Sequence, residues 1–276
     1  MYGWSVVADS DNLTISGLFH YPIKSCAGTS LVEANIGSRG IAHDREFMVV
    51  DASTGLFLTQ RDLPRMALIR PSVEDDLLRL DAPGVSQLVL DPVRQGPTCK
   101  VIVWRDRCHA IDQGPEVAAW LSKFLETDCR LVRMAEDHVR RVDRRYAVNE
   151  SDQVGFADGY PFLLISEESL ADLNIRLSDP LPMNRFRPNV VVSGGAAFQE
   201  DQWRCIRVGD IDFHLVKPCA RCVITTTDQA TGERGKEPLT TLASFRRKNR
   251  SVLFGQNMIH SGPGTIRHGD LVEVLA

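Results

Sequence analysis

The chain has 276 residues, of which 43% are hydrophobic and 25% are charged, and its formal net charge is −4. These values are ordinary for a globular protein long enough to bury a full core. We predict two domains, with one large β domain as the alternative. A slightly negative balance gives no overall attraction to nucleic acid or to an anionic membrane, so neither is predicted as a partner. Residues 1–13 lack the pattern of a signal peptide, and no apolar run reaches membrane-helix length. We therefore predict a cytoplasmic protein.

Short strands are predicted throughout residues 14–110. The segments are rich in Val, Ile, Leu and Phe, and Gly, Pro, Asp and Ser separate them. Their regular spacing is typical of an antiparallel β-barrel or sandwich. The predicted strands are residues 14–23, 30–36, 45–50, 56–60, 66–72, 77–82, 87–90 and 100–111.

A helix is predicted from Pro115 to Leu125, since Pro suits the first helical position and apolar residues recur at helical spacing. The following stretch, 130–150, is rich in arginine and has a weak apolar pattern. We interpret it as a solvated, partly flexible connection. The alternative is a docking surface for an acidic redox partner or for an anionic group of a cofactor.

The second half predicts another β-rich unit. A strand over 156–166 is entered through an Asp-Gly turn, and a helix over 167–177 follows with Ser166 as its N-cap. Residues 206–216 and 266–276 each place Gly-Asp between two short strands, which indicates two hairpins. The predicted fold is mainly β with a few helices. It has two β-barrel-like domains, over 1–135 and 136–276.

Basic residues at strand ends predict an anion site. Lys24 and Ser25 follow the first strand, and Arg45 begins a later one. An ammonium, a hydroxyl and a guanidinium together suit a phosphate group. Further along, the segment RFRPN adds Arg187 and Asn189. We expect an extended backbone at this segment, because Pro disfavours the helical region for the residue before it.

Seven cysteines are scattered along the chain, and in a reducing compartment most are expected to be buried thiols. Only Cys219 and Cys222 lie close together in sequence. Structural zinc would need further ligands at a suitable spacing, and a thioredoxin-type pair would open a helix, whereas VITTT after Cys222 favours a strand. Two interpretations stay open: inert core cysteines, or a thiolate stabilised by Lys217 and Arg221 that acts as nucleophile or soft-metal ligand.

Motifs spread over nearly the whole chain resemble those of a MOSC-domain protein preceded by a MOSC N-terminal β-barrel domain. The motifs are YPIKS (21–25), HDR (43–45), FADGYPFLL (156–164), NRFRPNVVVSG (184–194), KPCARCVITTTD (217–228), EPL (237–239), FGQN (254–257) and IRHGD (266–270). The subgroup that the chain resembles is the bacterial relatives of the mitochondrial amidoxime-reducing component, which reduce N-hydroxylated compounds.

The resemblance implies a molybdenum cofactor, with Cys222 as the thiolate ligand of the metal and Cys219 as packing without a metal role. It also implies a phosphate site for the pterin part of the cofactor, and further contacts at the FADGY and RFRPN segments. The cofactor site would then lie at the seam of the two domains. The residues so assigned are Lys24, Ser25 and Arg45 at the phosphate, Asp158 near the metal with a catalytic role, and Gly159, Arg187 and Asn189 at the cofactor.

The implied activity is reduction of N-hydroxylated small molecules by two-electron oxygen abstraction at molybdenum. Many bacterial members continue into a ferredoxin-like domain, and the mitochondrial members carry a membrane segment. Neither pattern is found here, so we expect a separate electron donor of ferredoxin or flavoprotein reductase type. The alternative is a sulfur carrier that holds a persulfide on Cys222.

Overall fold

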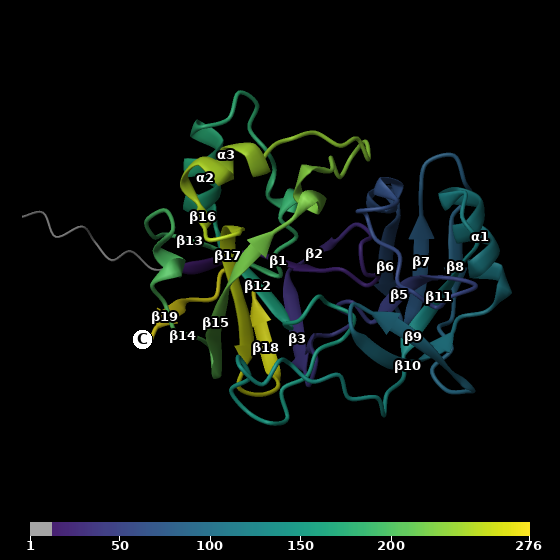
Figure 1. Cartoon of the computed structure of the whole chain (residues 1–276). Helices are drawn as coiled ribbons and strands as arrows, with labels where there is room; N and C mark the ends of the chain where they lie inside the picture. Colours follow the sequence, from purple (N-terminus) through teal and green to yellow (C-terminus); the bar gives the residue numbers. More distant parts are fainter. Residues whose placement is uncertain (1–12) are drawn as a thin grey trace, which may run out of the picture.

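The computed structural model describes residues 13–276, and this part of the chain is mainly β with three α-helices (Figure 1). The predicted fold class is confirmed. The largest sheet has nine strands in the order β19-β14-β15-β17-β12-β13-β1-β2, with β16 paired to β17. All of its neighbouring strands are antiparallel except β12 and β13. The strands are β1 (Thr14–His20), β2 (Thr29–Leu31), β12 (Phe162–Ser166), β13 (Val190–Ser193), β14 (Cys205–Val208), β15 (Ile211–Arg221), β16 (Arg247–Lys248), β17 (Ser251–His260) and β19 (Val272–Val274).

A second lobe, drawn in blue and teal in Figure 1, holds two smaller sheets and a helix. One sheet runs β5-β11-β10-β9 and the other β6-β7-β8. Leu121 and Phe124 of the helix α1 are buried in the core between these elements, as the helical spacing predicted. The elements are β5 (Phe47–Asp51), β6 (Arg70–Glu74), β7 (Leu77–Asp81), β8 (Leu88–Leu90), β9 (Thr98–Val103), β10 (Asp106–Asp112), α1 (Pro115–Leu125) and β11 (Cys129–Met134).

Two short helices, α2 (Glu167–Ile175) and α3 (Leu239–Phe245), lie together on one side of the large sheet (Figure 1). The predicted N-cap is confirmed, because the backbone N–H of Ser169 donates to Ser166 Oγ at 3.1 Å. No helix within residues 13–276 has both the length and the hydropathy needed to cross a bilayer.

Strand pairing joins the first strands of the described chain to its second half. β1 pairs with β13, and β3 (Glu33–Gly37) pairs with β18 (Gly264–Arg267) in a small sheet completed by β4 (Gly40–Ile41). Residues that directly follow β1 are therefore held against the second half of the chain. The division at residues 135 and 136 stays a prediction.

One predicted hairpin is confirmed and the other is wrong. β14 and β15 pair antiparallel across Gly209 and Asp210, and Gly209 adopts a positive φ of 56° that this tight turn requires. The strands β18 and β19, however, pair with β3 and β14 instead of with each other.

Two strands predicted in the first half, over 56–60 and 66–72, differ in the structure. Leu56 and Phe57 form only isolated bridges, and residues 58–60 form no strand. A 3-10 turn occupies Pro64–Leu68, and β6 begins only at Arg70. Pro64 favours this turn because its fixed φ suits the first position of a helical segment.

The prediction of a solvated connection over 130–150 is wrong in its first part. Arg130 and Arg133 lie on β11, inside a sheet. Arg140 is 6% exposed, and its guanidinium donates to the carbonyl oxygens of Gly155 and Ala157. Arg140 thereby holds the backbone of the FADGY segment and of the residue before it.

Candidate functional site

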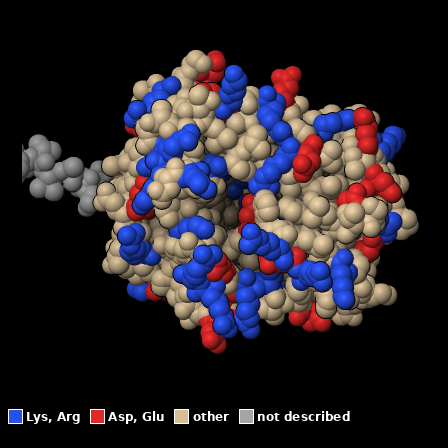
Figure 2. Space-filling view, viewed as in Figure 1, with Lys and Arg blue, Asp and Glu red and all other residues tan. Residues whose placement is uncertain are grey.

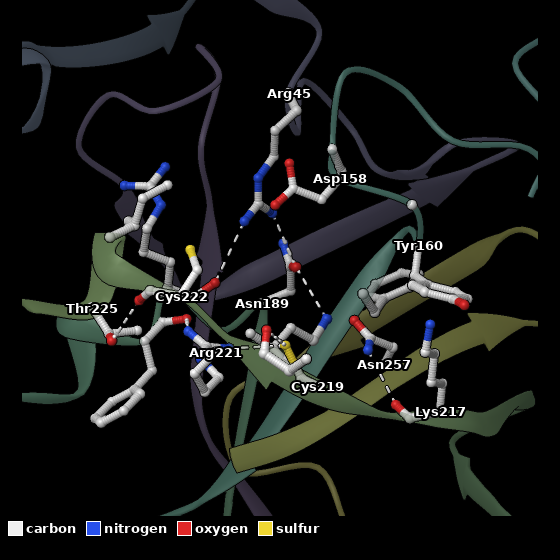
Figure 3. A pocket seen from close by; sticks show the side chains of 18 of the residues that line it. Arg45, Asp158, Tyr160, Asn189, Lys217, Cys219, Arg221, Cys222, Thr225 and Asn257 are labelled. Carbon is white, nitrogen blue, oxygen red and sulfur yellow. Dashed lines mark hydrogen bonds between the residues drawn. The ribbon is translucent and has the colours of Figure 1, made fainter. Parts of the chain in front are cut away.

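A cavity of about 300 Å³ opens between the two lobes. Figure 2 shows basic side chains gathered around a hollow at this place, and Figure 3 shows the lining from close by. The cavity brings together all the residues that the sequence analysis assigned to a site: Lys24, Ser25, Arg45, Asp158, Gly159, Arg187, Asn189 and Cys222. Their individual roles toward a cofactor stay predictions.

Lys24 and Asp158 form an ion pair at the cavity wall. Lys24 is 5% exposed, and its Nζ donates to the carbonyl of Phe156 at 2.8 Å and to Asp158 Oδ1 at 2.5 Å. Burial lowers the pKa of Lys24, and the attraction to Asp158 acts against this effect. Loss of hydration would raise the pKa of Asp158, but the charge of Lys24 holds this pKa well below its usual range. Asp158 is therefore a carboxylate at neutral pH.

Two arginines contact the ring of the buried Tyr21. The guanidinium carbons of Arg45 and Arg187 lie 4.2 and 4.3 Å from the ring centroid, and the hydroxyl of Tyr21 donates to the carbonyl of Pro188 at 3.0 Å. Arg45 Nη1 also donates to Asn189 Oδ1 at 3.0 Å. Burial lowers the pKa of Arg187 to about 10 and raises the pKa of Tyr21 to about 12, so both keep their ordinary protonation state.

The expected extended backbone at Arg187 is wrong. Arg187 has a positive φ of 57°. Arg185 lies in a 3-10 turn, Met183–Arg185, and its side chain contacts the carbonyl of Thr225. The left-handed conformation directs Arg187 to Tyr21 and to the carbonyl oxygen of Cys26 at 2.5 Å. Two specific contacts outweigh the local preference of a residue that precedes proline.

Ser25 lies in a tight loop against Tyr21. It is 6% exposed and has a φ of 67°, and its carbonyl accepts a hydrogen bond from Gln60 Nε2 at 2.8 Å. Nearby, a Cβ atom at Gly28 would lie 2.3 Å from the Tyr21 ring, which only glycine avoids. The loop is thereby held tightly beside the basic side chains.

The cysteine stretch leaves the sheet at Arg221. Cys222 is the N-cap of a 3-10 turn, Val223–Thr226, and the predicted strand over VITTT is wrong. The hydroxyl of Thr225 donates to the carbonyl of Cys222 at 2.9 Å, and that of Thr226 donates to the carbonyl of Val223 at 2.8 Å. Local hydroxyl-to-backbone bonds of this kind compete with strand pairing. The turn places Cys222 on the cavity wall.

Arg61 is the basic partner of Cys222, and the sequence analysis missed it. Arg61 Nη2 lies 3.3 Å from Cys222 Sγ, and its guanidinium carbon lies 4.6 Å from the centroid of the Trp104 ring. The carbonyl of Arg61 accepts a hydrogen bond from Arg234 at 3.1 Å. Neither Lys217 nor Arg221, the expected partners, contacts Cys222 through its side chain: Lys217 lies over Tyr146. No local pattern around residue 61 indicates this role.

Cys219 also lines the cavity and is half-buried, so it is not a core cysteine, and its lack of a metal role stays a prediction. Arg221 Nη1 lies 3.0 Å from Cys219 Sγ, and Arg221 Nη2 lies 2.5 Å from the carbonyl of Phe186 (Figure 3). Both cysteines are free thiols. The cavity therefore contains two thiols, each beside its own arginine.

The donor set of the cavity fits an anionic cofactor that brings its own metal ligands. Among residues 13–276, no three His, Cys, Asp or Glu side chains gather as a metal site, so a metal at Cys222 needs non-protein donors. A lone thiolate suits a soft metal held also by other sulfur atoms. Against the single carboxylate of Asp158, six cationic side chains line the cavity: Lys24, Arg45, Arg61, Arg187, Lys217 and Arg221.

Family models match both halves of the chain. The MOSC N-terminal beta barrel domain matches residues 12–128, and the MOSC domain matches residues 151–273. The chain belongs to the MOSC family. The cavity of this MOSC protein takes Lys24, Arg45 and Arg61 from the first matched range and Asp158 and Cys222 from the second.

The curated relatives include proteins with two different names. Mitochondrial amidoxime-reducing component 1 of Mus musculus is 38% identical over 95% of this chain and 82% of its own length. The Homo sapiens protein of the same name is 37% identical, over 95% of this chain and 83% of its own length. Molybdenum cofactor sulfurase of Bos taurus is 31% identical over 90% of this chain and 30% of its own length. The resemblance proposed from the motifs is confirmed.

Proposed function

We propose that this MOSC protein is a molybdenum cofactor-dependent oxidoreductase that reduces N-hydroxylated compounds. The observation that carries the proposal is the thiol of Cys222, which lies 3.3 Å from Arg61 Nη2 in a cavity dominated by cationic side chains. Relatives named amidoxime-reducing components, at 37–38% identity over most of the chain, support the substrate class.

The residues divide into two groups toward the cofactor. Lys24, Ser25 and Arg45 would hold its phosphate, since they bring two cations and a hydroxyl to the lining of the cavity, and Lys24 and Ser25 are buried. Cys222 would supply the single protein ligand to molybdenum. Arg187 and Asn189 would contact the organic part between these points, and Gly159 lines the same wall without a side chain.

When bound, the cofactor supplies two-electron abstraction of oxygen from an N–OH group. The chain itself orients the substrate through Asp158. Its Oδ1 accepts hydrogen bonds from Lys24 Nζ and from Trp104 Nε1 at 3.1 Å. Within residues 13–276, Oδ2 has no hydrogen-bond donor, and the side chain is 63% exposed. Oδ2 is therefore the atom that accepts a hydrogen bond from the substrate's N–OH group.

A separate electron donor completes the proposal. The basic side chains around the hollow in Figure 2 would attract an acidic ferredoxin or flavoprotein reductase by opposite-charge steering. Such a reaction would remove N-hydroxylated compounds from the compartment in which the protein acts, which we predict to be the cytoplasm.

A second candidate function is that of a sulfur carrier with a persulfide on Cys222. The relatives named molybdenum cofactor sulfurase favour it, as does the presence of two free thiols in one cavity. The presence of Lys24, Ser25 and Arg45 in the cavity lining favours the oxidoreductase, because a persulfide needs no phosphate site.

The test uses protein purified from a host that makes the molybdenum cofactor. We expect about one molybdenum per chain and reduction of benzamidoxime to benzamidine with an artificial electron donor. Arg45→Ala should lower the molybdenum content, and Lys100→Met, at an exposed position of β9, is the matched control. Protein that does not reduce benzamidoxime and carries a persulfide on Cys222 would support the sulfur carrier instead.

A further inference from the structure

Lys217 lies on β15 at the cavity wall, beside Tyr160 and Asn257 (Figure 3). The register of β15 against β17 shifts between Leu215 and Lys217, and again between Pro218 and Ala220. Bulges of this kind re-aim side chains and occur often beside binding sites. Here they accompany the side of β15 from which Lys217 and Cys219 line the cavity.

The ammonium group of Lys217 contacts aromatic rings alone. Its Nζ lies 4.5 Å from the ring centroid of Tyr146 and 5.9 Å from that of Tyr160. The two rings pack edge to face, with centroids 6.0 Å apart. Within residues 13–276, this Nζ has neither a carboxylate at ion-pair distance nor a hydrogen-bond acceptor. An ammonium has three N–H donors, and ring faces attract its charge but leave those donors unused.

The other cations of the cavity are already engaged. Lys24 pairs with Asp158 and Arg45 with Asp44, while the guanidinium groups of Arg61, Arg187 and Arg221 each contact a sulfur atom or a carbonyl oxygen. Lys217 thus differs from them in offering its full hydrogen-bonding capacity to a ligand. It also lies apart from Arg45 (Figure 3).

The surroundings of Lys217 define the shape of that ligand. Tyr160 presents a ring at the wall, and the pKa of its hydroxyl is raised by burial and by Tyr146, so the hydroxyl stays neutral. Asn257 Nδ2 donates to the carbonyl of Lys217 at 3.1 Å and holds the lysine backbone in place. A flat ligand body with one anionic group matches an aromatic wall beside a fixed cation.

We propose that Lys217 binds an anionic group of the substrate, so that the preferred N-hydroxylated compounds are planar molecules that carry a carboxylate. This inference rests on the proposed function. It adds a charge preference that neither the cofactor nor the N–OH group dictates.

The experiment compares benzamidoxime with 4-carboxybenzamidoxime, which differ only in the carboxylate. We expect kcat/KM to be about tenfold higher for the carboxylated compound, through a lower KM, because a charge-assisted hydrogen bond outside the reacting centre acts on ground-state binding. Lys217→Met should abolish the preference, and Lys217→Arg should keep most of it. Lys100→Met, which removes the same charge at an exposed position of β9, should leave it unchanged.

A second measurement separates this inference from the proposed function. Calorimetric binding of 4-carboxybenzamidine and of benzamidine needs no turnover, and we expect Lys217→Met to remove a preference of about tenfold for the former. If neither amidoxime is reduced, the proposed function fails and calorimetry alone decides about Lys217. Equal binding of the two amidines to the unchanged protein would overturn the inference. A loss of molybdenum from Lys217→Met would also overturn it, by assigning the lysine to the cofactor.

Discussion

The two thiols of the cavity differ in where their arginines come from. Arg221 lies two residues from Cys219 on the same strand, and the pair is a local feature of β15. Arg61 and Cys222 are 161 positions apart, and their contact joins the two matched domains. A local pair can form as soon as its strand forms, whereas the second pair exists only when both lobes are in place.

Further hydrogen bonds hold the segment of Arg61 against the loop that follows Cys222. Gln60 and Gln229 exchange side-chain hydrogen bonds at 3.1 Å, and Arg234 donates to the carbonyl oxygens of Gln60 and Arg61. The loop that follows Cys222 thereby holds the segment that carries Arg61. We infer that the folded arrangement of the two lobes, rather than the CxxC spacing, distinguishes Cys222 from Cys219.

The largest expected effect comes from Cys222→Ser. Loss of a metal's outer-shell partner commonly costs 10- to 100-fold in affinity or activity, and loss of the protein ligand itself should cost about 100-fold or more. We expect benzamidoxime reduction to fall at least that far, with an unchanged circular dichroism spectrum. Full activity in Cys222→Ser would show that Cys222 has no role that Cys219 lacks.

Arg61→Met should produce the next largest effect. The variant keeps the apolar stem against Trp104 but removes the hydrogen bond to Cys222 Sγ. We expect a loss of about 10-fold in activity at equal molybdenum content. Arg221→Met, from the local pair, is the matched control. A larger loss of activity in Arg221→Met than in Arg61→Met would show that the local pair matters more for the reaction than the contact between the lobes.

Lys24→Met extends the test to acid stability. Burial would raise the pKa of Asp158, but the charge of Lys24 lowers it, and the pKa lies below its usual value. A depressed carboxyl pKa stabilises the folded state above the unfolded pKa of about 3.9, and this stabilisation is lost as the pH falls further. The wild-type protein should therefore exceed Lys24→Met in stability at pH 7, and the difference should narrow below about pH 4.

Urea unfolding at pH 7 and at pH 3.5 measures that difference. A gap between the two proteins that stays constant over this range would show that Asp158 does not depend on Lys24 for its ionisation. Asp158→Asn is the control, since its amide does not titrate.

The smallest effect is expected from Cys219→Ser. Cys219 is half-buried and its bond to Arg221 is a single local contact, worth about 1 kcal/mol of stability. We expect activity within about threefold of wild type and an unfolding free energy lower by at most about 1 kcal/mol. A loss comparable with that of Cys222→Ser would give the two thiols equal roles.

Local patterns in the sequence predicted local structure well. The helix α1, the Ser166 cap and the β14–β15 hairpin each depend on residues within one or two turns of one another. The terminal hairpin failed because β18 and β19 have distant partners. The strand after Cys222 failed because threonine hydroxyls bond to nearby carbonyls there.

The sequence predicted which residues line the cavity better than it predicted the contacts among them. Motif resemblance brought Lys24, Arg45, Asp158 and Cys222 together, and the cavity contains all four. Arg61 could not be predicted, because no local spacing relates it to Cys222. The positive φ of Arg187 likewise depends on its contacts with Tyr21 and Cys26, which only the folded chain provides.

We propose that Cys222 alone supplies the protein ligand to molybdenum. X-ray absorption at the molybdenum edge counts the sulfur atoms bound to the metal in cofactor-loaded protein. We predict one sulfur fewer in Cys222→Ser than in the wild-type protein, and an unchanged count in Cys219→Ser. An unchanged sulfur count in Cys222→Ser, or a loss in Cys219→Ser, would contradict the account.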